Sequence, residues 1–262
     1  MAIFHQHFQV IGRSGRSANV VTSGSISGVI GKKSAVAASA YRSGTRLEER
    51  IVDVDGKNAL KVHDYRNKAG VIHSEILAPD QVHTNAWVYC RQELWNKVQE
   101  GERYKNAQYC REFDVALPVE LTQEENIELI RNYVDEFFVA RGMVADLSVH
   151  CDNEKNPHAH VMLTMRELVE GVNGDWSFSR VKNRQWNAIA FLKEARSNWA
   201  ERVNKELELR GFDDRISAVS YSELGISLTP TKHEGPARYI SNSRLTAYNK
   251  MAIKSNYRYH TA

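Results

Sequence analysis

The chain has 262 residues, of which 42% are apolar and 26% charged, a balance that is ordinary for a globular protein. No stretch reaches the ~18 uncharged apolar residues of a membrane-spanning helix, and the N-terminus lacks the pattern of a signal peptide, so we expect a cytoplasmic protein without membrane insertion. The net charge of +3 permits but does not require binding to nucleic acid, and three widely spaced cysteines argue against a disulfide framework or a structural zinc site.

The first half of the chain alternates short strands with helical segments. Alternating polarity predicts a strand over residues 4–11, and a Gly-, Ser- and Lys/Arg-rich loop or loose hairpin follows over residues 12–33. An Ala-rich composition after a possible Ser34 N-cap predicts a helix from residue 34 to about residue 49. The pair Asp55-Gly56 indicates a hairpin turn. The strands expected around and after it span residues 51–54, 60–63 and 71–77.

The second half continues in the same irregular alternation. A capping box, Thr122 to Glu125, predicts the start of a helix that reaches about residue 140. We expect further helices over residues 85–100 and 184–210, and strands over residues 110–117, 144–150 and 158–165. Strands joined by hairpins favour an α+β fold with an antiparallel sheet over a doubly wound parallel one.

Three histidines around a polar turn are the strongest chemical signal. His158 and His160 share one face of a predicted strand, and His150 lies with Asp146 and Ser148 on one face of the preceding strand. If the two strands pair, three imidazoles converge on one face of the sheet. Neutral imidazoles that leave coordination positions open suit a divalent cation acting as a Lewis acid. The helical H-E-x-x-H pattern of zinc proteases is absent.

Tyr41 lies inside the Ala-rich predicted helix, near basic residues that could meet phosphates: Lys33, Arg42 and Arg46. Taken alone, Tyr41 is an ordinary helix residue. A phenol with a pKa of about 10 is a poor nucleophile unless a polarised phosphate or a nearby base assists it. The histidine cluster is a possible source of that polarisation.

Four motifs in a fixed order resemble those of the MobA/MobL (MobQ-type) plasmid-mobilisation relaxases, which belong to the HUH endonucleases. The resemblance covers roughly residues 1–240, and the joint order of the motifs is more specific than any one of them. The motifs are Ala40-Tyr41, Arg111-Glu112-Phe-x-x-Ala-Leu-Pro118-x-Glu120-Leu-Thr122, Asn156-Pro-His-Ala-His-Val-Met162 and Pro230-Thr-x-His233-x-Gly-Pro236.

The resemblance implies a central five-stranded antiparallel sheet with flanking helices. It also implies a relaxase domain over residues 1–240, with residues 241–262 as a C-terminal tail or the start of a linker. Tyr41 matches the nucleophile that nicks one strand at a plasmid transfer origin, becomes linked to the 5′ phosphate and releases a 3′ hydroxyl. The order of tyrosine before histidines is that of relaxases, whereas related replication initiators have the reverse order.

The resemblance assigns roles to four further residues. His150, His158 and His160 match the ligands of Mn²⁺ or Mg²⁺. Glu112 matches an acidic residue that either orients a metal-binding histidine or accepts the tyrosine proton.

The implied partners are single-stranded DNA and a hairpin at the transfer origin, accessory relaxosome proteins and type IV secretion coupling proteins, in the bacterial cytoplasm. A basic and aromatic stretch after the histidines offers DNA contacts, although its aromatic side chains are equally typical of a core. Its members are Trp176, Phe178, Arg180, Lys182, Arg184 and Trp186. Two other functions stay open: a non-catalytic origin-binding protein on a degenerate relaxase fold, and a metal-dependent hydrolase that uses water.

Overall fold

The structure is a computed structural model that describes residues 4–13, 34–83, 85–102, 104–154 and 156–219, with residues 223, 225, 227, 229, 250 and 251. The chain divides into two compact units after Ile216, and the site lies in the first. No helix among the described residues is long and apolar enough to cross a membrane.

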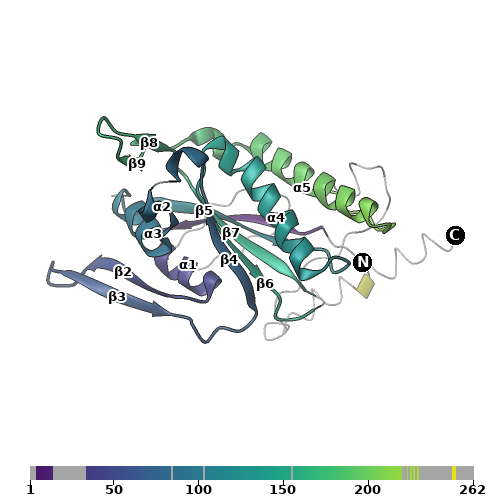
Figure 1. The fold of residues 1–262 in the computed structure, drawn as a ribbon, viewed down its shortest axis with the longest axis horizontal. Coiled ribbons are helices and arrows are strands. Elements are labelled where there is room, and N and C mark those ends of the chain that lie inside the picture. Colours follow the sequence, from purple (N-terminus) through teal and green to yellow (C-terminus); the bar gives the residue numbers. More distant parts are fainter. Residues whose placement is uncertain are drawn as a thin grey trace. The chain divides into compact units, whose positions relative to one another are not determined.

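A five-stranded antiparallel sheet forms the centre of the first unit, which confirms the predicted α+β class (Figure 1). Its strands lie in the order β1-β5-β7-β6-β4. Their bounds are β1 (Gln6–Gly12), β4 (Val71–Leu77), β5 (Gln108–Ala116), β6 (Ala145–His150) and β7 (His158–Thr164). Each differs from its predicted range by three residues at most.

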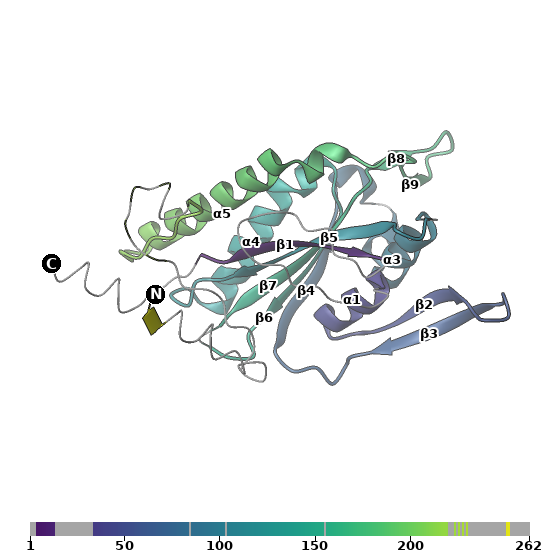
Figure 2. The same ribbon diagram turned by 180° about the vertical axis from the view of Figure 1, so that it is seen from behind.

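Helices cover both faces of this sheet, as Figures 1 and 2 show. The helices α4 (Gln123–Phe137) and α5 (Ile189–Leu209) cover one face, where Phe113 of β5 packs in an aromatic cluster with Tyr133, whose ring meets Trp199. The helices α1 (Ala35–Ser43) and α3 (Arg91–Glu100) lie on the other face and bond Asp146 of β6. Because side chains alternate along a strand, β5 sends Phe113 to the apolar face and Glu112 to the face of α1.

The helix α1 is shorter than the sequence predicts. Ser34 caps its first turn as expected, by accepting from the Ala37 N–H. The side-chain oxygen of Gln99 on α3 also accepts from the N–H of Ala35 at 2.6 Å. The helix ends at Ser43 because Gly44 adopts a left-handed conformation, with φ of 64°, that suits glycine and stops the helix. The predicted end at residue 49 is therefore wrong.

The residues after Gly44 form a two-stranded hairpin, β2 (Arg46–Val52) and β3 (Asn58–Asp64), which turns at Asp55-Gly56 as predicted. Leu47 is buried under α1 and α3, so tertiary packing favours the strand over a longer helix. Burial of Leu47 and pairing with β3 are both invisible to local helix propensity.

Other elements also differ from the predicted ranges. The helix expected over residues 85–100 breaks at Cys90, whose ψ of 103° is extended, into α2 (Ala86–Tyr89) and α3. The long helix expected from residue 184 starts at Ile189, after the short 3-10 helix η3 (Arg184–Asn187). The unpredicted hairpin has the strands β8 (Leu168–Glu170) and β9 (Trp176–Phe178). The other 3-10 helices are η1 (Asp80–Val82) and η2 (Val139–Arg141).

The carboxylate of Asp146 ties α1 and α3 to the sheet. It accepts from the Ser39 hydroxyl at 2.6 Å, from Arg91 Nε at 2.9 Å and from Trp95 Nε1 at 2.8 Å, and it is buried. We expect Asp146→Ala to lower the free energy of unfolding by about 3–5 kcal/mol, because it leaves a partly buried guanidinium and two buried donors without their acceptor.

Urea unfolding followed by circular dichroism measures this loss. Asp64→Ala is the matched control, since Asp64 pairs with Arg66 at an exposed position and should contribute little to stability. Equal midpoints for the two variants would contradict the anchoring role of Asp146.

Candidate active site

The three histidines meet on one face of the β6–β7 hairpin, as the alternation predicts. His150 of β6 is the direct cross-strand neighbour of His158, and His160 follows on the same face of β7. The ring centroids lie 5.2 Å (His150–His158), 5.0 Å (His150–His160) and 5.3 Å (His158–His160) apart. One nitrogen of each ring lies within 4.8 Å of one nitrogen of the others. This spacing lets one cation contact all three.

Burial keeps two of the rings neutral, and backbone carbonyls orient them. Burial lowers the pKa of His150 to about 4, and it also lowers the pKa of His158. His150 Nε2 bonds the carbonyl of Arg42 at 2.6 Å, and His158 Nδ1 bonds that of Asn156 at 2.9 Å. Metal-binding histidines characteristically donate one ring nitrogen in this way while the other binds the cation. The three residues therefore fit a first-row divalent cation.

Glu112 is fully buried beneath His160 and is saturated with contacts. Arg42 donates through Nε to one carboxylate oxygen and through a terminal nitrogen, at 2.5 Å, to the second. Gln9 Nε2 also donates to the second oxygen, at 2.8 Å. His160 Nδ1 lies 3.3 Å from the other oxygen, poorly aligned for a hydrogen bond. Burial alone would raise the pKa of Glu112, but the charge of Arg42 and the contact with His160 outweigh it, and the pKa is lowered.

An ionised carboxylate surrounded by donors is a poor proton acceptor. Of the two roles left open for Glu112, the geometry therefore favours the orientation of His160. Arg42 donates from its three nitrogens to Glu112 and to the carbonyl of Ala38. In this structure its guanidinium is paired with groups of the protein, whereas the sequence predicts that it meets a phosphate.

We expect Glu112→Gln to weaken Mn²⁺ binding about 10- to 100-fold, because the amide orients His160 less firmly and leaves Arg42 without its counter-charge. Isothermal titration with Mn²⁺ measures the affinity, and circular dichroism checks the fold. Glu194→Gln is the control, since that carboxylate pairs with Arg141 on the surface. An unchanged Mn²⁺ affinity in a folded Glu112→Gln would rule out the orienting role.

Tyr41 lies in the last turn of α1, beside the histidines, with 49% of its surface exposed. The carbonyl of the next residue, Arg42, is the one that bonds His150. The Tyr41 ring stands edge-on to Tyr65, with centroids 5.2 Å apart. Tyr41 therefore presents an exposed phenol on the helix whose last turn contacts one of three histidines that could hold a cation.

Lys68 is a residue of this site that the sequence did not single out. Its ammonium lies 4.1 Å from the centroid of the Tyr41 ring and donates to the Tyr41 carbonyl at 3.0 Å. Burial lowers the pKa of Lys68, while the charge of Asp152 opposes the change. Lys68 and Tyr65 come from the turn between β3 and β4, more than 20 residues after Tyr41, and no local pattern connects them to it.

The residues after β7 that were predicted to contact DNA lie away from the three histidines. Arg180, Lys182 and Arg184 line one groove beside Gln108, at the opposite end of β5 from Ala116, the strand neighbour of His158. Strand geometry makes that separation about 25 Å. Lys182 bonds the Gln108 carbonyl at 2.5 Å and lies 3.1 Å from Glu102.

Trp186 is only 7% exposed. Its ring therefore packs in the core, the alternative that the sequence left open, and a base cannot stack on it.

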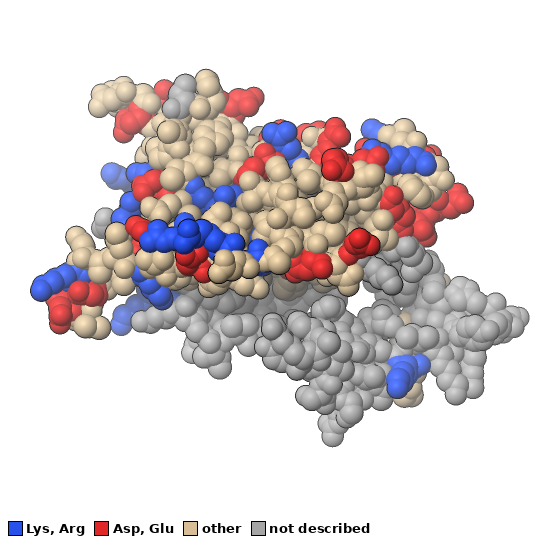
Figure 3. Space-filling model, turned by 60° about the horizontal axis from the view of Figure 1, so that its bottom comes forward, with Lys and Arg blue, Asp and Glu red and all other residues tan. Residues whose placement is uncertain are grey.

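Arg46 is partly exposed at the start of β2 and pairs with Glu48 at 2.8 Å. Residues 14–33, which include Lys33, lie outside the described residues, and so does the motif around His233. In Figure 3, Lys and Arg side chains gather on the left half of the visible face, beside the β2–β3 hairpin.

Comparisons with known proteins agree with this geometry. Residues 33–244 match the model of the MobA/MobL family. A structure described as "Molecular Basis of Vancomycin Resistance Transfer in Staphylococcus aureus" superposes with a TM-score of 0.67 at 32% identity, covering 84% of this chain and 100% of that one.

Curated relatives include "Conjugal transfer protein TraA" of Agrobacterium fabrum, 32% identical over 78% of this chain and 20% of the relative. "Mobilization protein MobL" of Acidithiobacillus ferridurans is 29% identical over 78% of this chain and 58% of the relative. The "43 kDa relaxation protein" of Salmonella typhimurium is 27% identical over 67% of this chain and 54% of the relative. The chain thus spans about a fifth of the TraA relatives that it matches. Because the family model matches more than half of its residues, the chain belongs to the MobA/MobL family.

Proposed function

We propose that this chain is the DNA-nicking part of a conjugative relaxase, which cleaves one strand of DNA at a plasmid transfer origin. The observation that carries the proposal is the meeting of three imidazoles at the end of the helix that bears an exposed tyrosine. Membership of the MobA/MobL family and the names of its relatives, which refer to conjugal transfer, mobilization and relaxation, support it.

In the proposed reaction, the phenolic oxygen of Tyr41 attacks the scissile phosphorus. A bond forms between that oxygen and phosphorus, and the bond from phosphorus to the 3′ oxygen breaks. The phenol loses its proton to solvent, and the departing oxygen takes one up as a 3′ hydroxyl. The product is a 5′-phosphotyrosine, so one phosphodiester is exchanged for another and the step is reversible. It needs no other reactant.

The histidines would hold the divalent cation that this chemistry requires. A cation bound by His150, His158 and His160 supplies positive charge to the phosphate oxygens as negative charge develops on them. Glu112, fixed by Arg42, orients His160. Imidazole ligands suit Mn²⁺ better than Mg²⁺ on chemical grounds, whereas Mg²⁺ is the more abundant cation in cells.

The test is formation of a covalent adduct. The protein is incubated with Mn²⁺ and end-labelled single-stranded oligonucleotides tiled across its native transfer origin, and the products are separated on a denaturing gel. A labelled band at the mass of protein plus DNA supports the proposal. Cleavage without an adduct would favour a hydrolase that uses water, and DNA binding without either product would favour the non-catalytic alternative.

Lys68 is expected to assist the reaction from above the Tyr41 ring, where its charge attracts an approaching phosphate. We expect Lys68→Met to slow adduct formation about 100-fold, the lower end of the loss caused by removing one preorganised electrostatic contact. The measurement is the single-turnover rate at saturating Mn²⁺. Lys61→Met on the β2–β3 hairpin is the control, and equal rates for the two variants would remove Lys68 from the proposed site.

The DNA-binding surface is proposed on the same basis. The transfer-origin strand would enter at the histidines, and the basic groove of Arg180, Lys182 and Arg184 would contact phosphates farther along it. The hairpin at the origin, relaxosome proteins and type IV coupling proteins are the proposed partners, and the proposed extent of the nicking domain is residues 1–240.

A further inference from the structure

A buried guanidinium lies on the opposite side of β5 from the proposed active site. Arg111 is 4% exposed, and one of its terminal nitrogens bonds Asn187. Its Nε and its other terminal nitrogen have no hydrogen-bond partner among the described residues. Burial lowers the pKa of Arg111 to about 10, so the group keeps its charge at neutral pH. A buried charge without a partner is strongly destabilising unless something in its cavity compensates it.

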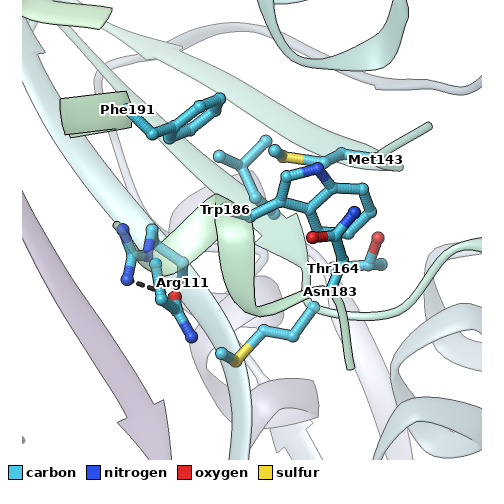
Figure 4. A pocket seen from close by; sticks show the side chains of 9 residues that line it. Arg111, Met143, Thr164, Asn183, Trp186 and Phe191 are labelled. Carbon is cyan, nitrogen blue, oxygen red and sulfur yellow. Dashed lines mark hydrogen bonds between the residues drawn. The ribbon is translucent and has the colours of Figure 1, made fainter. Parts of the chain in front are cut away.

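Arg111 borders a small cavity beneath η3 (Figure 4). The volume of the cavity is about 10 Å³, comparable with the space that one water molecule needs, so it holds at most one group of about that size. The residues around it include no Asp or Glu, so the described lining offers no carboxylate to balance the charge. They are Arg111, Met143, Leu163, Thr164, Met165, Asn183, Trp186, Asn187 and Phe191.

The start of α5 adds a second positive feature to the same cavity. The helix has 21 residues, and its N-cap, Ala188, provides no side-chain hydrogen bond to the first turn. The first turn also contains no acidic residue. Asn187 and Phe191, on either side of this helix start, both line the cavity. Unpaired N–H groups and the helix dipole make such a terminus attractive to anions.

We infer that this cavity binds a small monovalent anion of the size of chloride, held between Arg111 and the N-terminus of α5. A water molecule would accept the free hydrogen bonds but would leave the charge uncompensated. A phosphate group is too large for the space, and Trp186 covers the cavity on the side of η3. The bound anion would fasten η3 and α5 to the back of β5, the strand that presents Glu112 on its front.

The first experiment measures thermal unfolding of the protein as chloride replaces gluconate at constant ionic strength. Because a ligand that binds only the folded state stabilises it by mass action, we expect the melting temperature to rise by about 3–6 °C at ten times the dissociation constant. Arg111→Met should lose this rise. Arg196→Met should keep it, since Arg196 is a partly buried arginine that donates to the Gln6 carbonyl at 2.6 Å and does not line the cavity.

The second experiment needs no variant and decides the matter if Arg111→Met does not fold. Crystals of the unmodified protein grown in bromide should show an anomalous peak within hydrogen-bonding distance of Arg111 Nε. A melting temperature independent of halide, together with a density peak that gives no anomalous signal, would overturn the inference and identify the occupant as water. Neither readout depends on nicking, so the outcome is independent of the proposed function.

Discussion

Tyr41→Phe is expected to abolish the covalent protein–DNA adduct and to reduce strand cleavage by at least about a thousandfold, because it removes the only atom of this side chain that can attack phosphorus. The fold should survive, since Tyr41 is about half exposed and the edge-on contact with Tyr65 is made between the rings, which phenylalanine retains. Single-turnover assays with the matched oligonucleotide and Mn²⁺ measure both products.

Tyr65→Phe provides the matched control for this experiment. Its ring is the aromatic neighbour of Tyr41, so the variant tests whether any nearby phenol can substitute. We expect it to form the adduct at close to the original rate. An adduct that persists in Tyr41→Phe would mean that another residue is the nucleophile, and cleavage that persists without an adduct would mean that water is.

Removal of one of the proposed metal ligands should have a comparable effect. We expect His158→Ala to weaken Mn²⁺ binding by at least about 100-fold and to prevent adduct formation at micromolar Mn²⁺, because two imidazoles cannot replace three as ligands. In the unaltered protein, a chelator should stop the reaction and added Mn²⁺ should restore it. His83→Ala is the control, since His83 is exposed and its Nδ1 bonds the nearby Asp80 carbonyl, away from the three histidines in the chain.

The pH dependence of Mn²⁺ binding follows from the buried histidines. A lowered pKa means that an imidazole stays neutral to a lower pH than a free histidine, and burial brings the pKa of His150 to about 4 and lowers that of His158. Protons therefore compete with Mn²⁺ at these two rings only below the ordinary titration range of histidine, and at His150 only near pH 4. We expect the Mn²⁺ affinity of the unaltered protein at pH 6 to be similar to its affinity at pH 7. The control His83→Ala should behave in the same way. A steep loss of affinity from pH 7 to pH 6 would contradict the burial of the ligands.

Local patterns predicted the parts of the site that lie close together in the chain. His150, His158 and His160 are separated by one turn, and strand alternation alone places them on a common face. The capping box at Thr122 and the turn at Asp55-Gly56 also formed as predicted, because their hydrogen bonds involve residues a few positions apart. Amino-acid sequence determines such features through short-range geometry.

Only the tertiary structure decided which distant groups meet. The pairing of Arg42 with Glu112 joins residues 70 positions apart, and it places a guanidinium that the sequence predicts at a phosphate against a buried carboxylate near His160. The position of Lys68 over Tyr41 and the burial of Trp186 have the same origin. The sequence determines the charge and size of each side chain. Whether a side chain faces solvent or the interior depends on which elements pack against it, because the native fold is the arrangement in which the contacts of all elements are satisfied together.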